Sequence, residues 1–164
     1  MTSNNSSKIE TVFQDLRKKR EAALIGYLTA GLPSPAQAPA AAEALIRGGV
    51  DILELGVPFS DPIADGPTIQ ASSNRALSLG VTPETVFSTV KKIKSKHPKT
   101  PIVLLTYYNP IYKMGVNHFM ETCQSSGVNG LVVPDLPVEE ADEYRGLAEK
   151  HDVDTIFLAS PATV

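Results

Sequence analysis

Short apolar runs alternate with amphipathic segments along the whole chain. The runs predict strands over residues 23–29, 50–56, 101–107, 130–133 and 154–159. They are apolar at nearly every position, which indicates strands buried on both faces and therefore a parallel sheet. Helical spacing of apolar residues predicts a first helix over 7–20, and further helices between the strands over 34–47, 83–97, 117–126 and 138–151.

The stretch between the second and third strands, residues 58–82, is longer than the other connections. We expect it to hold a long loop and an extra helix over 67–79. Pro67 stands near the first helical position, where the missing N–H of proline costs nothing.

Strands that alternate with helices are compatible with two architectures. One is an open doubly wound sheet, and the other is an incomplete (β/α)₈ barrel, whose full length is about 250 residues. The turn after the first strand, residues 29–33, carries neither the glycine pattern of a dinucleotide site nor that of a P-loop. Its sequence disfavours a nucleotide-binding open sheet without establishing the barrel.

Composition narrows the class of protein. The 164 residues suit one domain, and a net charge of -3 argues against a nucleic-acid binder. A single cysteine, Cys123, permits no internal disulfide, and the polar start and the lack of a long apolar run predict a cytoplasmic protein. The three histidines show no metal-ligand spacing, so we predict no metal site and expect His97, His118 and His151 at the surface.

Candidate chemistry is concentrated at the end of the second strand. Glu54 lies near the carboxyl end of this strand, where parallel α/β proteins build their sites, and a loop with Asp61 and Asp65 follows. Burial would raise the pKa of Glu54 and suit it to proton transfer near neutrality. The residues alone leave other roles open: a salt-bridged structural carboxylate for Glu54, a helix cap for Asp65 and a turn for Asp61.

The fourteen residues from Leu53 to Gly66 resemble the characteristic motif of the tryptophan synthase alpha subunit. The similarity runs from about Val12 to the last residue. Further matching segments are Gly31-Leu32-Pro33, Pro67-Thr68-Ile69-Gln70, Leu105-Thr106-Tyr107-Tyr108-Asn109-Pro110 and Val133-Pro134-Asp135-Leu136-Pro137.

This resemblance implies an incomplete (β/α)₈ TIM barrel with about five of its eight strands, as one partial domain over residues 1–164. It also implies an activity: retro-aldol cleavage of indole-3-glycerol phosphate to indole and glyceraldehyde 3-phosphate in tryptophan biosynthesis, without cofactor or metal. By the resemblance Glu54 moves a proton to indole C3, and Asp65 pairs with the indole N–H. The positions that match the indole pocket are Tyr27, Leu105, Tyr107, Pro134 and Leu158, with core packing as the alternative for Leu105 and Leu158.

The family resemblance also implies a partner. We expect a tryptophan synthase beta subunit, which carries pyridoxal phosphate, or a fused beta domain of the fungal type that the polar N-terminus resembles. The loop over 58–66 would face that partner. The phosphate-binding loops of the family follow later strands than this sequence holds, so an alternative is an unstable, inactive fragment that at most binds or regulates the beta subunit. A third reading, another sugar-phosphate barrel such as an isomerase, conflicts with the motif at 53–66.

Overall fold

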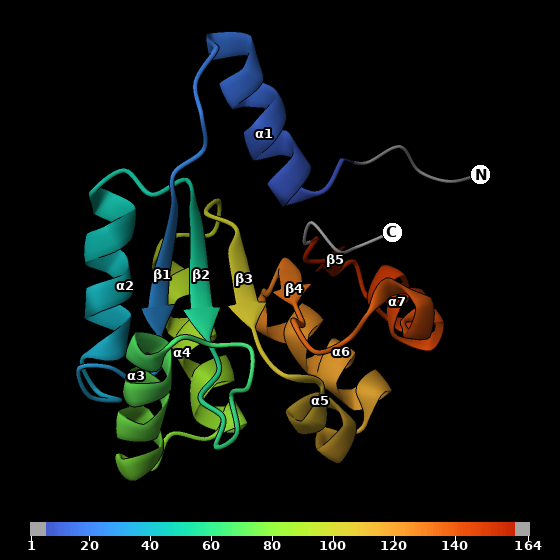
Figure 1. Ribbon diagram of the computed structural model, residues 1–164. Helices are drawn as coiled ribbons and strands as arrows, with labels where there is room; N and C mark the ends of the chain where they lie inside the picture. Colours follow the sequence, from blue (N-terminus) through green and yellow to red (C-terminus); the bar gives the residue numbers. More distant parts are fainter. Residues whose placement is uncertain (1–5, 160–164) are drawn as a thin grey trace.

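The computed structural model describes residues 6–159, and its centre is a parallel sheet (Figure 1). The five strands follow one another in the sheet in chain order: β1 (Ile25–Thr29), β2 (Ile52–Gly56), β3 (Ile102–Leu105), β4 (Gly130–Val132) and β5 (Asp154–Ile156). A doubly wound sheet reverses its strand order at a switch point. The unbroken order seen here has no such point, so the predicted barrel-type winding is confirmed and the open doubly wound alternative is wrong.

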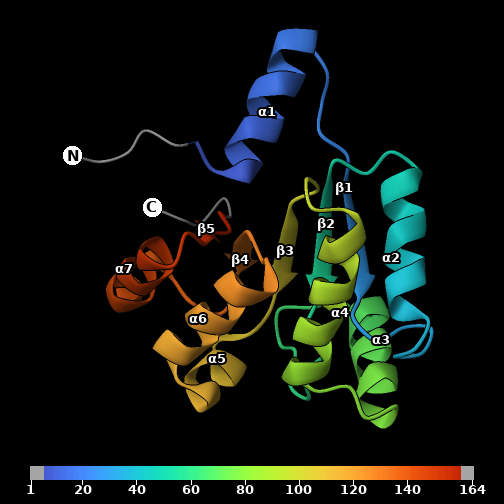
Figure 2. The same cartoon turned by 180° about the vertical axis from the view of Figure 1, so that it is seen from behind.

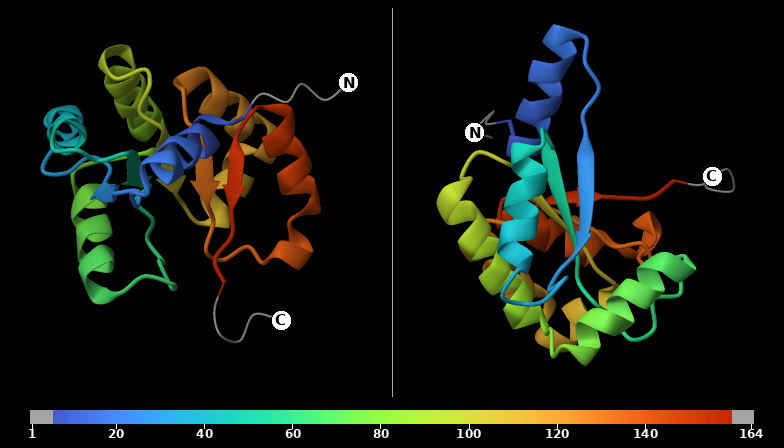
Figure 3. Two further views of the ribbon diagram at one scale, coloured as in Figure 1. Left: turned by 90° about the horizontal axis from the view of Figure 1, so that it is seen from above. Right: turned by 90° about the vertical axis from the view of Figure 1, so that its left-hand side faces the viewer.

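Helices lie on one side of the sheet and at its two ends (Figures 2 and 3). The connections between strands contain α2 (Ala38–Arg47), α4 (Pro83–Lys96), α6 (Val116–Ser126) and α7 (Asp142–Lys150). The first helix, α1 (Lys8–Lys19), lies by the amino ends of the strands, whereas α3 (Pro67–Ser78) and α5 (Tyr108–Met114) lie by the carboxyl ends.

Helix ends occur where the sequence places capping residues. The Ser7 hydroxyl accepts a hydrogen bond from the backbone N–H of Glu10 at 3.1 Å, which starts α1. Pro67 opens α3 as predicted, and α6 ends at Gly127 in the left-handed conformation (φ 90°) that glycine adopts without strain. The predicted elements are confirmed with small shifts at their ends.

Two local features differ from the sequence prediction. Helix α5 was not predicted, and the predicted helix over 138–151 is divided into a short 3₁₀ helix (Val138–Glu140) and α7. The start of α5 is fixed by a distant residue: the Asp135 carboxylate accepts the backbone N–H of Tyr108 at 2.9 Å. The pattern of apolar residues around α5 carries no information about a capping residue that comes from the loop after β4.

Alternate strand residues face two separate cores. Odd-numbered residues of β2 and even-numbered residues of β3 point to the helices and join a large cluster that includes Leu53, Leu55, Ile102, Leu104, Val90, Phe119 and Met120. The opposite face carries a smaller cluster of Ile52, Val103 and Val132, against which Ile9, Val12, Leu105 and Ile156 pack. Helix α1 therefore covers the amino end of the inner face, and the carboxyl end of that face is left for other side chains.

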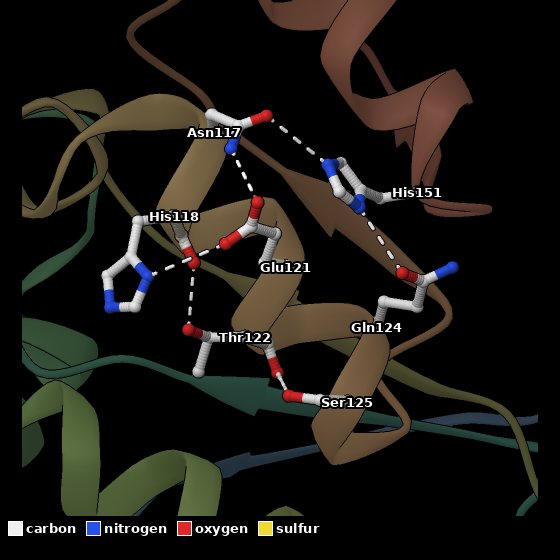
Figure 4. Close-up of polar contacts among 7 residues, drawn as sticks. All are labelled: Asn117, His118, Glu121, Thr122, Gln124, Ser125 and His151. Atoms are coloured by element: carbon white, nitrogen blue, oxygen red, sulfur yellow. Dashed lines mark hydrogen bonds and ion pairs between the residues drawn. The ribbon is translucent and has the colours of Figure 1, made fainter.

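His151 is buried between α6 and α7, so its predicted surface position is wrong (Figure 4). Its ring contacts two amide oxygens of α6, with Nδ1 at 3.2 Å from Gln124 Oε1 and Nε2 at 3.3 Å from Asn117 Oδ1. A neutral imidazole has one N–H and can donate it to one of these oxygens, and that hydrogen bond offsets part of the cost of burying a polar ring. His118, whose side chain is 66% exposed, is at the surface as predicted.

Within residues 6–159, no helix combines the length and the apolar character that crossing a membrane requires.

Candidate active site

Glu54 stands in the middle of β2 on the inner face of the sheet. The register places Tyr27 of β1 on one side of it and Val103 of β3 on the other. The side chain is half-buried, and burial raises the pKa of its carboxyl. Across residues 6–159 no hydrogen bond or ion pair reaches this carboxylate, so the cation that a purely structural role requires is not found there.

Tyr27 lies against Glu54 and leads a chain of hydroxyl groups. Its Oη is 3.2 Å from Thr29 Oγ1, which is 2.7 Å from Ser72 Oγ of α3. Burial raises the pKa of Tyr27, the hydrogen bond with Thr29 opposes this rise, and the charges of Asp65 and Glu54 raise it further. The Tyr27 hydroxyl is therefore close enough to interact electrostatically with both carboxylates.

The ring of Tyr27 can lie where it does because position 56 is a glycine. A Cβ atom at Gly56 would overlap the Tyr27 hydroxyl oxygen and would come within 2.8 Å of Cζ. The glycine at the end of β2 thus leaves space for the ring across the strand, two residues beyond Glu54.

Asp65 lies in the loop between β2 and α3, next to Tyr107. Burial raises the pKa of the Asp65 carboxyl, and the nearby Tyr107 hydroxyl acts in the opposite direction. Gly66, rather than Asp65, is the N-cap of α3, and no side chain caps this helix, so the capping alternative is wrong. Asp61 has the turn geometry expected of it, since its carbonyl accepts the N–H of Ile63 at 2.9 Å.

The remaining predicted pocket residues spread along the carboxyl end of the sheet. Leu105 pairs with Gly56 and Val132 and packs on the inner-face cluster. Pro134 and Leu158 line a separate groove after β4 and β5, and Leu158 is 62% exposed. The structure places Tyr27 near both Glu54 and Asp65, and Tyr107 near Asp65. Pro134 and Leu158 line the other groove, and the pocket roles of all five residues stay predictions.

A groove of about 500 Å³ lies outside this carboxylate pair, between the β2–α3 loop and α5. Its lining includes Phe59, Asp61, Asn109 and Lys113, but neither Glu54 nor Asp65. The groove is therefore distinct from the carboxylate site, although the same loop borders both.

Sequence reasoning missed three side chains that hold this end of the sheet together. Thr29 and Ser72 join β1 to α3, and Asp135 joins the loop after β4 to the start of α5. Thr29 could have been found, because it follows Tyr27 by two residues and so shares its face of the strand. Among residues 6–159 no group of three potential metal ligands comes together.

The sheet winding, with Glu54 on the inner face of β2 and Asp65 on the loop after its carboxyl end, defines an incomplete (β/α)₈ barrel with a site on the side that enzymes of this fold use. The family model for the tryptophan synthase alpha chain matches residues 13–164. The chain belongs to the tryptophan synthase alpha chain family.

Relatives and solved structures agree with this assignment. The tryptophan synthase alpha chain of Methanosarcina acetivorans is 46% identical over 162 residues, covering 99% of this chain and 58% of the relative. That of Klebsiella pneumoniae subsp. pneumoniae is 44% identical over 154 residues, covering 94% of this chain and 57% of the relative. The crystal structure of tryptophan synthase subunit alpha from Legionella pneumophila str. Paris superimposes with a TM-score of 0.95 at 36% identity, covering 98% of this chain and 61% of that one.

A crystal structure of tryptophan synthase from M. tuberculosis also superimposes, with a TM-score of 0.92 at 38% identity, covering 98% of this chain and 64% of that one. The chain thus spans about three fifths of the length of the proteins it matches.

Proposed function

We propose that the chain carries the catalytic carboxylates of the tryptophan synthase alpha reaction, the cleavage of indole-3-glycerol phosphate to indole and glyceraldehyde 3-phosphate. The observation that carries the proposal is the half-buried Glu54 on the inner face of β2, whose carboxylate has no hydrogen bond or ion pair within residues 6–159, with Asp65 on the loop that follows the strand. We further propose that residues 1–164 form one partial barrel domain in the cytoplasm.

The physical chemistry of the two carboxylates fits two different roles. Burial raises the pKa of Glu54, which brings its proton affinity closer to neutrality and suits it to protonate indole C3 before the C–C bond breaks. Asp65 would pair with the indole N–H as positive charge develops on the ring. A fixed carboxylate stabilises that charge more than it stabilises the neutral substrate, so the interaction favours the transition state.

A retro-aldol cleavage of this kind requires only proton transfer, so the proposal includes no cofactor for the alpha reaction. Pyridoxal phosphate would belong to a beta subunit or a fused beta domain, which we propose as the partner of this chain. The loop over 58–66 would face it, because that loop and α5 line an open groove beside the site.

The test is indole release, measured by absorbance, from the chain as it stands and from a completed chain. The completed chain carries after Val164 the C-terminal remainder of the Methanosarcina acetivorans relative. Glu54→Gln should abolish indole release from the active form. The matched control is Glu149→Gln, an exposed residue of α7, which should leave it unchanged.

The outcomes separate the competing proposals. Wild-type turnover in the Glu54→Gln variant would refute the catalytic assignment. If only the completed chain releases indole, while the 164-residue chain stimulates a beta subunit, the 164-residue chain is an inactive fragment that binds its partner. Release by both forms would show that the first five strands hold the chemistry.

A further inference from the structure

The loop that carries Asp65 has few contacts of its own to fix it. Within the loop, the N–H of Ile63 donates to the carbonyl of Asp61 and the N–H of Asp65 donates to that of Pro62. The side chain of Ile63 is 83% exposed, so the tip of the loop is not held by apolar packing. Asp65 itself is joined to α3, because Gln70 Nε2 donates to its carbonyl at 2.9 Å. The part of the loop before Asp65 depends on contacts with the segment that follows β3.

Tyr107, the residue that follows Thr106 at the end of β3, supplies that contact. Its Oη accepts the backbone N–H of Ala64 at 2.9 Å, across 43 positions of sequence. Its ring stacks on Phe59, with centroids 5.2 Å apart and planes at 29°. The side chain is only 3% exposed, so it is fixed by packing at both its ring and its hydroxyl.

We propose that Tyr107 is the positioning residue for Asp65: its hydroxyl accepts the Ala64 N–H, which holds the loop one residue before Asp65, and donates its own proton to the Asp65 carboxylate. One residue just beyond the end of β3 thus acts on both the loop and the carboxylate. A phenol has one proton and can accept and donate at once. With the Ala64 N–H accepted by the oxygen, the hydroxyl proton stays available for the neighbouring carboxylate. The inference rests on the proposed function and gives Tyr107 a task beyond lining a pocket.

The contact also affects which form of Asp65 is present. A hydrogen bond donated to a carboxylate favours the charged form, and Tyr107 lowers the pKa of Asp65 against the rise that burial causes. The role proposed for Asp65 requires the charged form. Tyr107 would thus set both the place and the charge of this carboxylate.

The experiment uses the completed chain with Tyr107→Phe, which keeps the ring and its stacking on Phe59 and removes only the hydroxyl. The matched control is Tyr108→Phe, which removes the hydroxyl of the adjacent, partly buried residue on α5. Two measurements need no substrate: the pH titration of the Asp65 carboxyl carbon by ¹³C NMR, assigned with Asp65→Asn, and the hydrogen exchange rate of the Ala64 amide.

In Tyr107→Phe we expect the Asp65 titration midpoint to move to higher pH and the Ala64 amide to exchange faster, with neither change in Tyr108→Phe. The kcat for indole release should fall about tenfold or more, the cost of one lost hydrogen bond to a charged group. The acid limb of its pH profile should move in the same direction as the titration.

An unchanged Asp65 midpoint and an unchanged Ala64 exchange rate in Tyr107→Phe would overturn the inference. So would a loss of activity of the same size in Tyr108→Phe. These results are distinct from failure of the proposed function, which is the absence of indole release from the wild-type completed chain, because the titration and the exchange rate are read without turnover.

Discussion

Gly56→Ala should destabilise the protein through one contact, between the added Cβ atom and the ring of Tyr27. The Cβ would overlap the hydroxyl oxygen and approach Cζ and Cε2 to 2.8 and 2.9 Å, so the whole end of the ring has to move. Moving it breaks the hydrogen bond to Thr29. Overpacking costs about 1–3 kcal/mol and the lost hydrogen bond about 1 kcal/mol, which gives a loss of about 2–4 kcal/mol in the free energy of unfolding.

The assay is urea denaturation of the completed chain followed by circular dichroism. Tyr27→Leu removes the three atoms that the new Cβ would meet, the hydroxyl oxygen, Cζ and Cε2, so in that background Gly56→Ala should cost little. The control is Gly146→Ala in the middle of α7, where an added Cβ meets nothing within 4 Å and should stabilise the helix by about 0.5–1 kcal/mol. If the losses in free energy of unfolding caused by Gly56→Ala and Tyr27→Leu add in the double variant to within about 0.5 kcal/mol, the two residues do not interact and the reasoning is refuted.

Three further predictions concern buried or capping charges. Burial lowers the pKa of Lys94 from 10.5 to about 8, so between these pH values the unfolded chain binds more protons than the folded one. The free energy of unfolding should therefore rise with pH in this range. Lys94→Met should remove that rise, measured by urea denaturation at pH 8–9.5. Burial raises the pKa of Glu54, so the stability that its protonated carboxyl contributes is lost as the pH rises through its pKa in the folded protein. Glu54→Gln should therefore have a higher melting temperature than the wild type at pH 7. The difference in melting temperature should vanish below pH 4.5, where the carboxyl is protonated in both states. Asp135→Ala should cost about 1 kcal/mol by removing the cap on Tyr108, whereas Asp135→Asn should retain most of it; equal losses in urea melts would contradict this.

The regular elements could be predicted because each is encoded by a local pattern. Ser7 caps α1, Pro67 opens α3 and Gly127 closes α6, and each signal lies within the element it bounds. Strand order could not be read from periodicity, since β-strands of a doubly wound sheet carry the same apolar runs. The structure resolves this through the pairing of β1 with β2 and of each later strand with the one before it.

Two of the features that sequence reasoning missed depend on contacts between distant residues. Helix α5 begins at a backbone N–H capped by Asp135, 27 positions away. His151 is buried because Asn117 and Gln124 of another helix offer their amide oxygens to its ring. Neither pairing has a local signature, so the surface position predicted for this histidine followed the general exposure of polar residues and was wrong.

The two candidate carboxylates are held in different ways, and this difference bears on how the site works. Glu54 belongs to a strand paired on both sides, so its place is fixed by backbone hydrogen bonds. Asp65 belongs to a loop whose tip is exposed. This part of the chain is held by Tyr107, through the Ala64 N–H, and by Gln70 of α3, which donates to the Asp65 carbonyl. A change in that loop can therefore move Asp65 or alter its protonation state while leaving Glu54 in place. A partner that contacts the loop over 58–66 would act on the carboxylate proposed to stabilise developing charge, and not on the one proposed to transfer the proton.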